Sequence, residues 1–187
     1  VRTNRDFSSP FFNQRETGKT VLIVIAGDRG LAGGYNSNVL KMAQSKLDQY
    51  PNAVVLPIGK RALDHFVSHK VPVLTETYAE AAGVSIGDCF SIAKQLSKGF
   101  LSGELRKKGE ASGIKYEPSS EEVFASIVPE YLGGILYGTL CESRASEQAA
   151  RRSAMDSATQ NAEDMIADLS LKFNRARQAS ITQEITE

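Results

Sequence analysis

The sequence predicts an α/β fold in which a Rossmann-like, partly parallel sheet carries a long projecting helix. Three observations favour it: an apolar, β-branched run over residues 20–27, alternating strand and helix patterns after it, and an uninterrupted helical pattern from Pro129 to Glu187. Alternating strands and helices are typical of parallel sheets with helices on their faces. We therefore predict an α/β globular domain over residues 1–128 and a coiled-coil helix over 129–187.

The globular part is expected to begin with a strand buried on both faces, because its Val and Ile residues do not alternate with polar ones. A glycine-rich turn follows, and then a helix through residues 39–47 that Asn36 or Ser37 caps. Residues 53–59 form a second strand, and Pro57 indicates the end of that strand or an edge of the sheet.

The remaining elements of the domain follow in order. We expect a short helix over residues 60–69, a weaker extended stretch over 71–75, and a helix that Ser85 caps and that runs to about Leu101. Residues 113–118 are expected to be extended and to lead into a further helix with acidic residues in its first turn.

The last third of the chain is too long for a compact domain. Pro129 to Glu187 is 59 positions, whereas typical helices run about 8–20 residues, and the rod would span about 88 Å at roughly 1.5 Å per residue. One apolar stripe repeats along it at helical spacing. The stripe consists of Ala158, Ala162, Met165, Leu169, Phe173 (or Lys172 beside it), Ala176 and Ser180. Such a stripe predicts a second helix alongside, and no other segment here is long enough to supply it.

Composition excludes several classes of partner. With 187 residues and a formal net charge of +0, the chain lacks the basic surface expected of a nucleic-acid-binding protein. It also lacks a run of about 18 apolar residues, so we expect no direct membrane insertion. Cys89 and Cys141 lie in apolar stretches and are interpreted as inert, buried thiols in a reducing compartment. The sequence opens with Val1 and has no signal segment, so we expect it to start within a longer protein.

The glycine-rich turn is the first place to look for chemistry. Its structural residues are Asp28, Arg29, Gly30, Gly33 and Gly34. The spacing matches neither the P-loop nor the dinucleotide-binding glycine motif. We interpret it as a tight turn that uses glycines at positive φ, with Asp28 and Arg29 paired locally. A phosphate- or nucleotide-binding α/β protein that uses the loop from Gly27 to Gly34 remains the alternative.

Other candidate sites are weaker. His65 and His69 have helical spacing for metal ligands, but no third ligand accompanies them, and a solvated helix face is the preferred interpretation. Gly134 and Gly138 suit close helix packing or a soft helix rather than a membrane motif. The sequence shows no catalytic constellation, and we predict no cofactor and no metal.

Four motifs carry a resemblance to a known family. They are the turn at residues 28–36, the Tyr116–Pro118 turn, the stretch from Glu142 to Thr159 and the terminal segment from Arg175 to Glu187. Together they resemble the gamma subunit of the F-type ATP synthase, the central rotor stalk. The motifs occur in the order found in that family and cover nearly the whole chain.

The resemblance implies a non-catalytic rotor that transmits torque between ion flow and ATP synthesis or hydrolysis. It implies an N-terminal helix that pairs with the C-terminal helix, so that the rod is half of an antiparallel coiled coil inside a ring of alpha and beta subunits. It also implies an epsilon subunit and a membrane ring of c subunits, at the cytoplasmic face of a bacterial membrane. Arg177, Gln178 and Thr182 match the family's contacts with the catalytic subunits. A coiled-coil scaffold without a rotary role is the other alternative.

The chain departs from the family pattern at one internal place. After Phe100–Glu104 the family carries a further strand and a variable segment, whereas this sequence passes directly to residues 105–113. We favour the interpretation that the sequence joins two parts of a longer one, since loss of a central strand would open the core.

Overall fold

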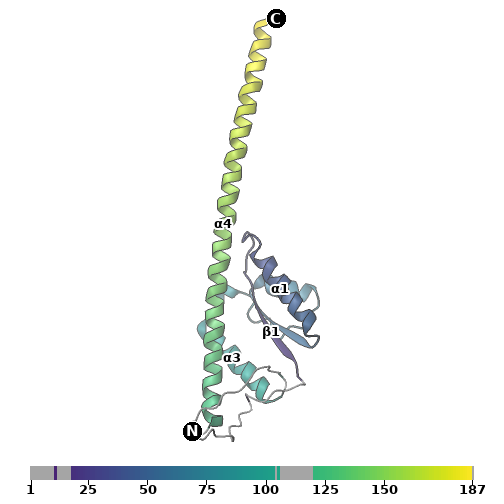
Figure 1. Ribbon diagram of the computed structural model, residues 1–187, viewed down its shortest axis with the longest axis vertical. Coiled ribbons are helices and arrows are strands. Elements are labelled where there is room, and N and C mark those ends of the chain that lie inside the picture. Colours follow the sequence, from purple (N-terminus) through teal and green to yellow (C-terminus); the bar gives the residue numbers. More distant parts are fainter. Residues whose placement is uncertain (1–10, 12–17, 104, 106–119, 187) are drawn as a thin grey trace, which may run out of the picture.

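The structure is a computed structural model that describes residues 11, 18–103, 105 and 120–186. It consists of a small α/β head and one long helix, α4 (Ser120–Thr186), whose lower part lies against the head and whose upper part projects as a straight rod (Figure 1). At roughly 1.5 Å of rise per residue its 67 residues span about 100 Å. The predicted fold class, a partly parallel sheet with a projecting helix, is confirmed. The extended stretch expected at 113–118 lies outside the described residues.

Within the residues that the structure describes, the sheet of the head has two parallel strands. Strand β1 (Thr20–Ile25) pairs with β2 (Ala53–Ile58) in a register from Thr20 opposite Ala53 to Ile25 opposite Ile58. Pro57 lies one residue before the end of β2 and is paired with Val24 of β1, so the strand ends close to the position that the proline indicated. Val55 of β2 also forms an isolated parallel bridge with Val73. Val73 lies within residues 71–75, the stretch that the sequence predicts to be extended.

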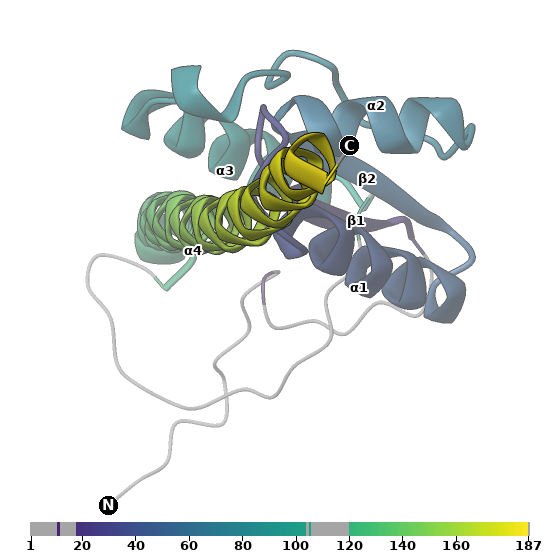
Figure 2. The same cartoon turned by 90° about the horizontal axis from the view of Figure 1, so that it is seen from above.

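Three helices complete the head: α1 (Tyr35–Gln49), α2 (Lys60–Ser68) and α3 (Ile86–Leu101), with a short 3-10 helix, η1 (Ala81–Gly83), before the last. Seen along the rod, α3 lies beside the lower part of α4, and α2 lies away from it (Figure 2). Gly34 is the N-cap of α1, so the expected cap at Asn36 or Ser37 is wrong.

The N-cap predicted for α3 is confirmed. Ser85 accepts a hydrogen bond from the Asp88 amide, and the Asp88 carboxylate accepts one from the Ser85 amide at 2.8 Å, so the two residues form a capping box.

The two faces of the sheet bury two separate cores. One contains β2 residues Leu56 and Ile58 together with Ile92 of α3 and Leu140 of α4. The other, on the opposite face, packs residues of β1 and β2 against α1 and α2, around the fully buried Phe66. Helix α4 is therefore part of the hydrophobic core of the head over its lower half.

One face of α4 makes that contact. Its buried residues recur at steps of three, four and seven, as one helical face requires. They are Pro129, Gly133, Leu136, Leu140 and Glu147. The helix starts at Ser120 and runs through Pro129, so the helix expected after Pro118 and the long helix expected from Pro129 are one continuous element. Packing on α3 outweighs the local cost of a proline within the helix.

The close approach of α3 and α4 occurs at Gly133 rather than at the predicted glycine pair. A β-carbon on Gly133 would overlap the Phe90 ring, whereas one on Gly134 or Gly138 would meet open space. Gly134 and Gly138 therefore do not mediate helix packing among the described residues, and the glycine that does lies one position away from the first of them.

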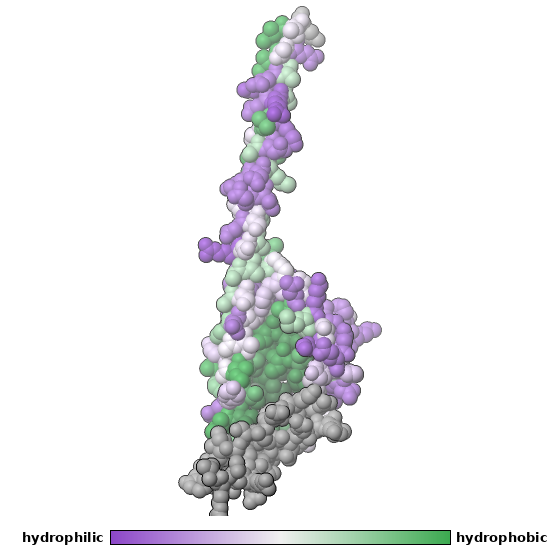
Figure 3. Space-filling view, viewed as in Figure 1, coloured by the Kyte–Doolittle hydropathy of each residue, from purple (hydrophilic) through white to green (hydrophobic). Residues whose placement is uncertain are grey.

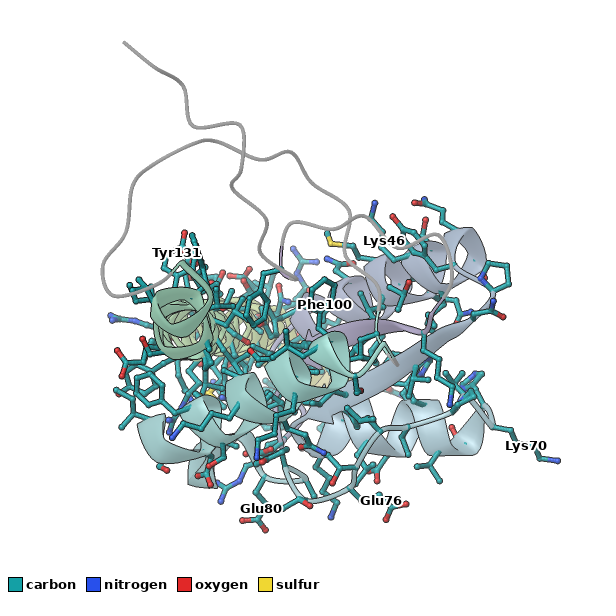
Figure 4. All side chains as sticks on the ribbon, turned by 90° about the horizontal axis from the view of Figure 1, so that it is seen from below. Lys46, Lys70, Glu76, Glu80, Phe100 and Tyr131 are labelled. Atoms are coloured by element: carbon teal, nitrogen blue, oxygen red, sulfur yellow. The ribbon has the colours of Figure 1, made fainter. Side chains whose placement is uncertain are left out.

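The surface of the rod changes character along its length. A hydrophobic surface covers the junction of α4 with the head, and hydrophilic residues dominate the projecting part (Figure 3). Viewed from below, Phe100 lies near the centre of the head, and Lys70, Glu76 and Glu80 lie at its periphery (Figure 4). By length and composition one stretch of α4 is apolar enough to cross a membrane. A helix in the core of a soluble domain passes the same test, and α4 packs on α3 in its lower half.

Candidate functional site

The loop between β1 and α1 lies directly against α4 and is held by its own side chains. Asn36 accepts a hydrogen bond from the Gly27 amide at 2.8 Å and donates one to the Arg29 carbonyl at 3.2 Å. Positive φ values occur at Leu31 (62°) and Gly33 (52°). The predicted tight turn is therefore present, but Gly30 and Gly34 do not supply positive φ, and a leucine occupies one of the two left-handed positions.

Asp28 connects the loop to two other parts of the head. Its carboxylate accepts hydrogen bonds from the backbone amides of Ala81 at 2.8 Å, Ala82 at 3.0 Å and Lys60 at 3.2 Å. These amides belong to η1 and to the first residue of α2, where unpaired donors favour a negative charge. The expected local pair between Asp28 and Arg29 is wrong, because the carboxylate binds these amides instead.

Two residues of α4 complete the site from the other side. The Glu147 carboxylate lies where a β-carbon on Gly27 would be, so only glycine fits at that position. Arg151 Nη2 lies 2.6 Å from Glu147 Oε1 and donates to the Gly30 carbonyl at 3.3 Å. The two side chains are only 11% and 16% exposed. An ion pair on the long helix is thereby held inside the loop of the head.

This arrangement already occupies backbone amides that a phosphate would need. A glycine loop that binds phosphate presents free backbone amides at the start of a helix. Here Asn36 accepts from the Gly27 amide, and Asp28 accepts from the amide of Lys60 at the start of α2. The carboxylates of Asp28 and Glu147 already place two negative charges at the loop. The geometry therefore argues against the phosphate- or nucleotide-binding alternative.

The other sequence candidates do not form a site. Among the described residues, no group of three or more His, Cys, Asp or Glu side chains could hold a metal ion. The rings of His65 and His69 lie 4.2 Å apart, and partial burial together with the neighbouring His69 lowers the pKa of His65. Cys89 is buried, and burial raises the pKa of its thiol. Cys141 is exposed, so its predicted burial is wrong.

Comparison with known proteins places this arrangement in a family. The family model described as ATP synthase matches residues 1–109 and 102–187. An ATP synthase gamma chain from Ruminococcus albus is 40% identical over 221 aligned positions that cover 100% of this chain and 77% of the relative. The chain belongs to the ATP synthase gamma-chain family. It is thus a subunit of a membrane-associated complex.

Two further relatives of this gamma-chain sequence are informative. A sodium-ion-specific gamma chain from Acetobacterium woodii is 35% identical, with 95% of this chain and 75% of the relative covered. In structure, the central stalk of the Tetrahymena thermophila mitochondrial ATP synthase matches with a TM-score of 0.56 and 20% identity, over 80% of this chain and 81% of that one. That likeness supports the fold.

The comparisons also locate the internal departure from other gamma chains. The two family matches meet at residues 102–109, next to the position where the sequence lacks the expected strand. The Ruminococcus alignment runs over 221 positions against 187 residues here, a difference of 34 positions without a counterpart in this chain. Lys19, just before β1, forms a parallel bridge with Leu105, so the chain beyond α3 starts at the open edge of β1.

The three residues that the gamma-chain resemblance assigns to the catalytic ring lie far up the rod. Arg177, Gln178 and Thr182 are exposed, and the Thr182 hydroxyl donates to the Gln178 carbonyl at 2.8 Å. They lie on the upper part of α4 and do not meet the loop residues, which are at the head.

Sequence reasoning missed Glu147 and Arg151, the residues of α4 that meet the loop. Their spacing of four residues is the signal that could have drawn attention to them, because such a pair lies on one helical face. The sequence did not indicate their partner, since 121 positions separate Arg151 from Gly30.

Proposed function

We propose that this chain is the non-catalytic rotor shaft of an ATP synthase and transmits torque between a membrane ring and the catalytic subunits. The observation that carries the proposal is the division of α4. Its lower half is part of the core of the head, and every described residue from 155 to 186 is exposed. A rod anchored at one end suits a part that turns inside a surrounding ring.

The proposed partners follow from the two ends of the rod. The alpha and beta subunits surround the upper part of α4, where Arg177, Gln178 and Thr182 contact the loops of the catalytic subunits. The head faces the epsilon subunit and the ring of c subunits at the cytoplasmic face of a bacterial membrane. An N-terminal helix covers the stripe that contains Met165 and Leu169, which are 68% and 64% exposed here. Rotation then biases each catalytic subunit through its conformations in turn.

The deciding experiment is reconstitution of the chain with alpha and beta subunits, followed by observation of a probe on the head during ATP hydrolysis. We expect rotation with the chain as given and its loss on removal of residues 175–187. Co-purification without rotation would favour a static scaffold. Micromolar nucleotide binding by the isolated chain in calorimetry would support the nucleotide-binding alternative instead.

The contact residues are tested in the same reconstituted complex. We expect Arg177→Ala with Gln178→Ala and Thr182→Ala to reduce coupled ATP synthesis about fivefold or more, because each lost polar contact is worth about 1 kcal/mol. The matched control is Gln160→Ala with Asp164→Ala, an exposed hydrogen-bonded pair lower on α4. Equal activity of the two variants would remove the assignment.

A further inference from the structure

We propose that Glu147, Arg151 and the loop over residues 27–33 form a rotational lock, the joint through which torque passes between the head and the rod. The inference rests on the proposed rotor function and assigns a mechanical role to an ion pair of this chain. In this role Glu147 and Arg151 are positioning residues, because they hold α4 at one rotational setting against the head.

The polar contacts between α4 and the head gather in one short stretch. Glu147 and Arg151 enter the loop, with Arg151 bound both to Glu147 at 2.6 Å and to the Gly30 carbonyl at 3.3 Å. One turn lower, the Tyr35 hydroxyl lies 2.6 Å from Ser143 Oγ. Beside them, Arg144 donates to the Ala82 carbonyl at 3.5 Å. Above Ala154 every described residue of α4 is exposed.

The position of these contacts matters for a rotating part. Torque that arises at the upper rod meets the head first at residues 143–154, because the helix is unsupported by the described residues above them. Contacts lower on α4 are mainly apolar, for example those of Leu136 and Leu140. These apolar contacts, together with the approach of Phe90 to Gly133, determine where α4 crosses the head, but they lie farther from the projecting rod than residues 143–154 do.

The ion pair adds an interaction whose energy depends on the rotational setting of α4. A charge-assisted hydrogen bond weakens steeply with a change of angle, and the Glu147 carboxylate fills the space that Gly27 leaves by having no side chain. A rotation of α4 about its axis would carry Glu147 into the loop backbone or out of the loop, and would part Arg151 from Gly30. Buried ion pairs are weak contributors to stability, and the fixing of register is their better-attested role.

The test uses the complete ATP synthase, with this chain as its gamma subunit and with Cys141 replaced by serine throughout. The variant Glu147→Gln with Arg151→Met removes both charges at similar side-chain size, so that no unpaired charge stays buried. The matched control is Arg152→Met with Asp156→Asn, an ion pair with the same spacing on the next residues whose side chains are 87% and 75% exposed. Ion pumping per ATP hydrolysed is measured against an increasing opposing gradient, together with thermal unfolding of each complex.

We expect the lock variant to hydrolyse ATP at close to the parent rate and to slip under load. Ion pumping per ATP against a steep gradient should fall roughly tenfold, the change expected on loss of one charge-assisted contact. The control should pump as the parent does. If the lock variant pumps as well as its control under load, the inference is wrong.

A disulfide between the loop and α4 is a second test, and it distinguishes a mechanical role of the ion pair from a contribution to stability alone. A β-carbon on Gly33 would lie 3.8 Å from the Ala154 β-carbon, close to the mean separation in disulfides. Adding Gly33→Cys and Ala154→Cys to the lock variant should restore pumping under load when oxidised and lose it again on reduction. Because Gly33 has a positive φ of 52°, a cysteine there strains the loop, and the parent with the same two cysteines is therefore the control. If that parent pumps normally when oxidised and the oxidised lock variant still slips, the proposal is contradicted.

If the double variant does not assemble, Arg151→Lys takes its place, since lysine keeps the charge without the planar fork that reaches two acceptors. Partial slip supports the lock, and full coupling under load contradicts it. The failure of the inference is distinct from that of the proposed function. A parent complex that does not rotate removes the rotor assignment, whereas a parent that rotates beside an equally coupled lock variant removes the lock alone.

Discussion

The Phe90 ring of α3 lies against the backbone of Gly133 in α4, at a distance that excludes a β-carbon. The contact brings the two helices together beside the core residues Ile92 and Leu136, on the face of the sheet that anchors the rod. Its geometry determines where α4 can cross the head.

Gly133→Ala should destabilise the head. The added methyl group forces the Phe90 ring to shift within a packed core, and overpacking of this kind costs about 1–3 kcal/mol of the free energy of unfolding. Gly134→Ala is the matched control, because a β-carbon there meets open space and alanine in a helix is favoured over glycine by about 1 kcal/mol. Urea denaturation should therefore show opposite signs. A stabilising effect at both positions would contradict the packing assigned to Gly133.

Asp28→Ala should lower the free energy of unfolding by about 1–3 kcal/mol, since backbone amides of η1 and α2 lose their acceptor. Asp28→Asn should cost less, because its amide oxygen still accepts. Asp48→Ala is the control: Asp48 is exposed and accepts a single hydrogen bond from Gln44. Chemical denaturation of the three variants checks the order. If Asp28→Ala is as mild as the control, the carboxylate does not organise the loop.

The features that the sequence predicts correctly depend on residues close together in the chain, and the features that it misses depend on residues far apart. The N-cap at Ser85 and the helical pattern of α4 depend on residues within a few positions of one another, and the sequence predicted both. Asp28 instead meets the Ala81 amide 53 positions away. The glycine-rich turn drew attention to the Asp28 carboxylate but not to its partners, and the prediction that it pairs with Arg29, its neighbour in sequence, is wrong.

The burial of residues on α4 likewise depends on contacts with distant parts of the chain. The acidic first turn after Pro118 predicted the start of a helix, but the continuation of that helix through Pro129 depends on contact with α3, which no local propensity contains. Glu147 appears on a predominantly polar stretch and is nevertheless 8% exposed. Only the glycine at position 27, 120 positions earlier in the chain, makes space for it.

Acid should weaken the start of α3 in a way that depends on Ser85. Hydrogen bonds from the Ser85 side chain and then from its backbone amide lower the pKa of Asp88 below its ordinary value of 3.8. In the unfolded chain Asp88 has the higher pKa, so it is protonated there first as pH falls. The stabilisation from the hydrogen bonds between Ser85 and the Asp88 carboxylate is therefore fully present above the ordinary pKa of 3.8, and it is lost as pH falls from there through the lower pKa of the folded state.

The measurement is the difference in free energy of unfolding between parent and Ser85→Ala, followed from neutral pH down to the lowest pH at which both stay folded. We expect the difference to shrink as Asp88 is protonated. Ser37→Ala serves as control, since the Ser37 hydroxyl donates to the Gly34 carbonyl and has no carboxylate partner. A difference for Ser85→Ala that stays constant with pH would show that Asp88 does not depend on the cap.

The exposed stripe of α4 should make the isolated chain self-associate. Leu169 and Phe173 are 64% and 68% exposed and lie on one helical face. Burial of such side chains against a second helix is favourable by about 1.5–3 kcal/mol each. We expect sedimentation velocity to show association that falls when Leu169→Gln and Phe173→Gln are introduced together. Leu171→Gln, at a position 51% exposed on the other side of the helix, should leave the association unchanged. A monomeric parent chain with its full helical content would mean that α4 is stable without a covering partner.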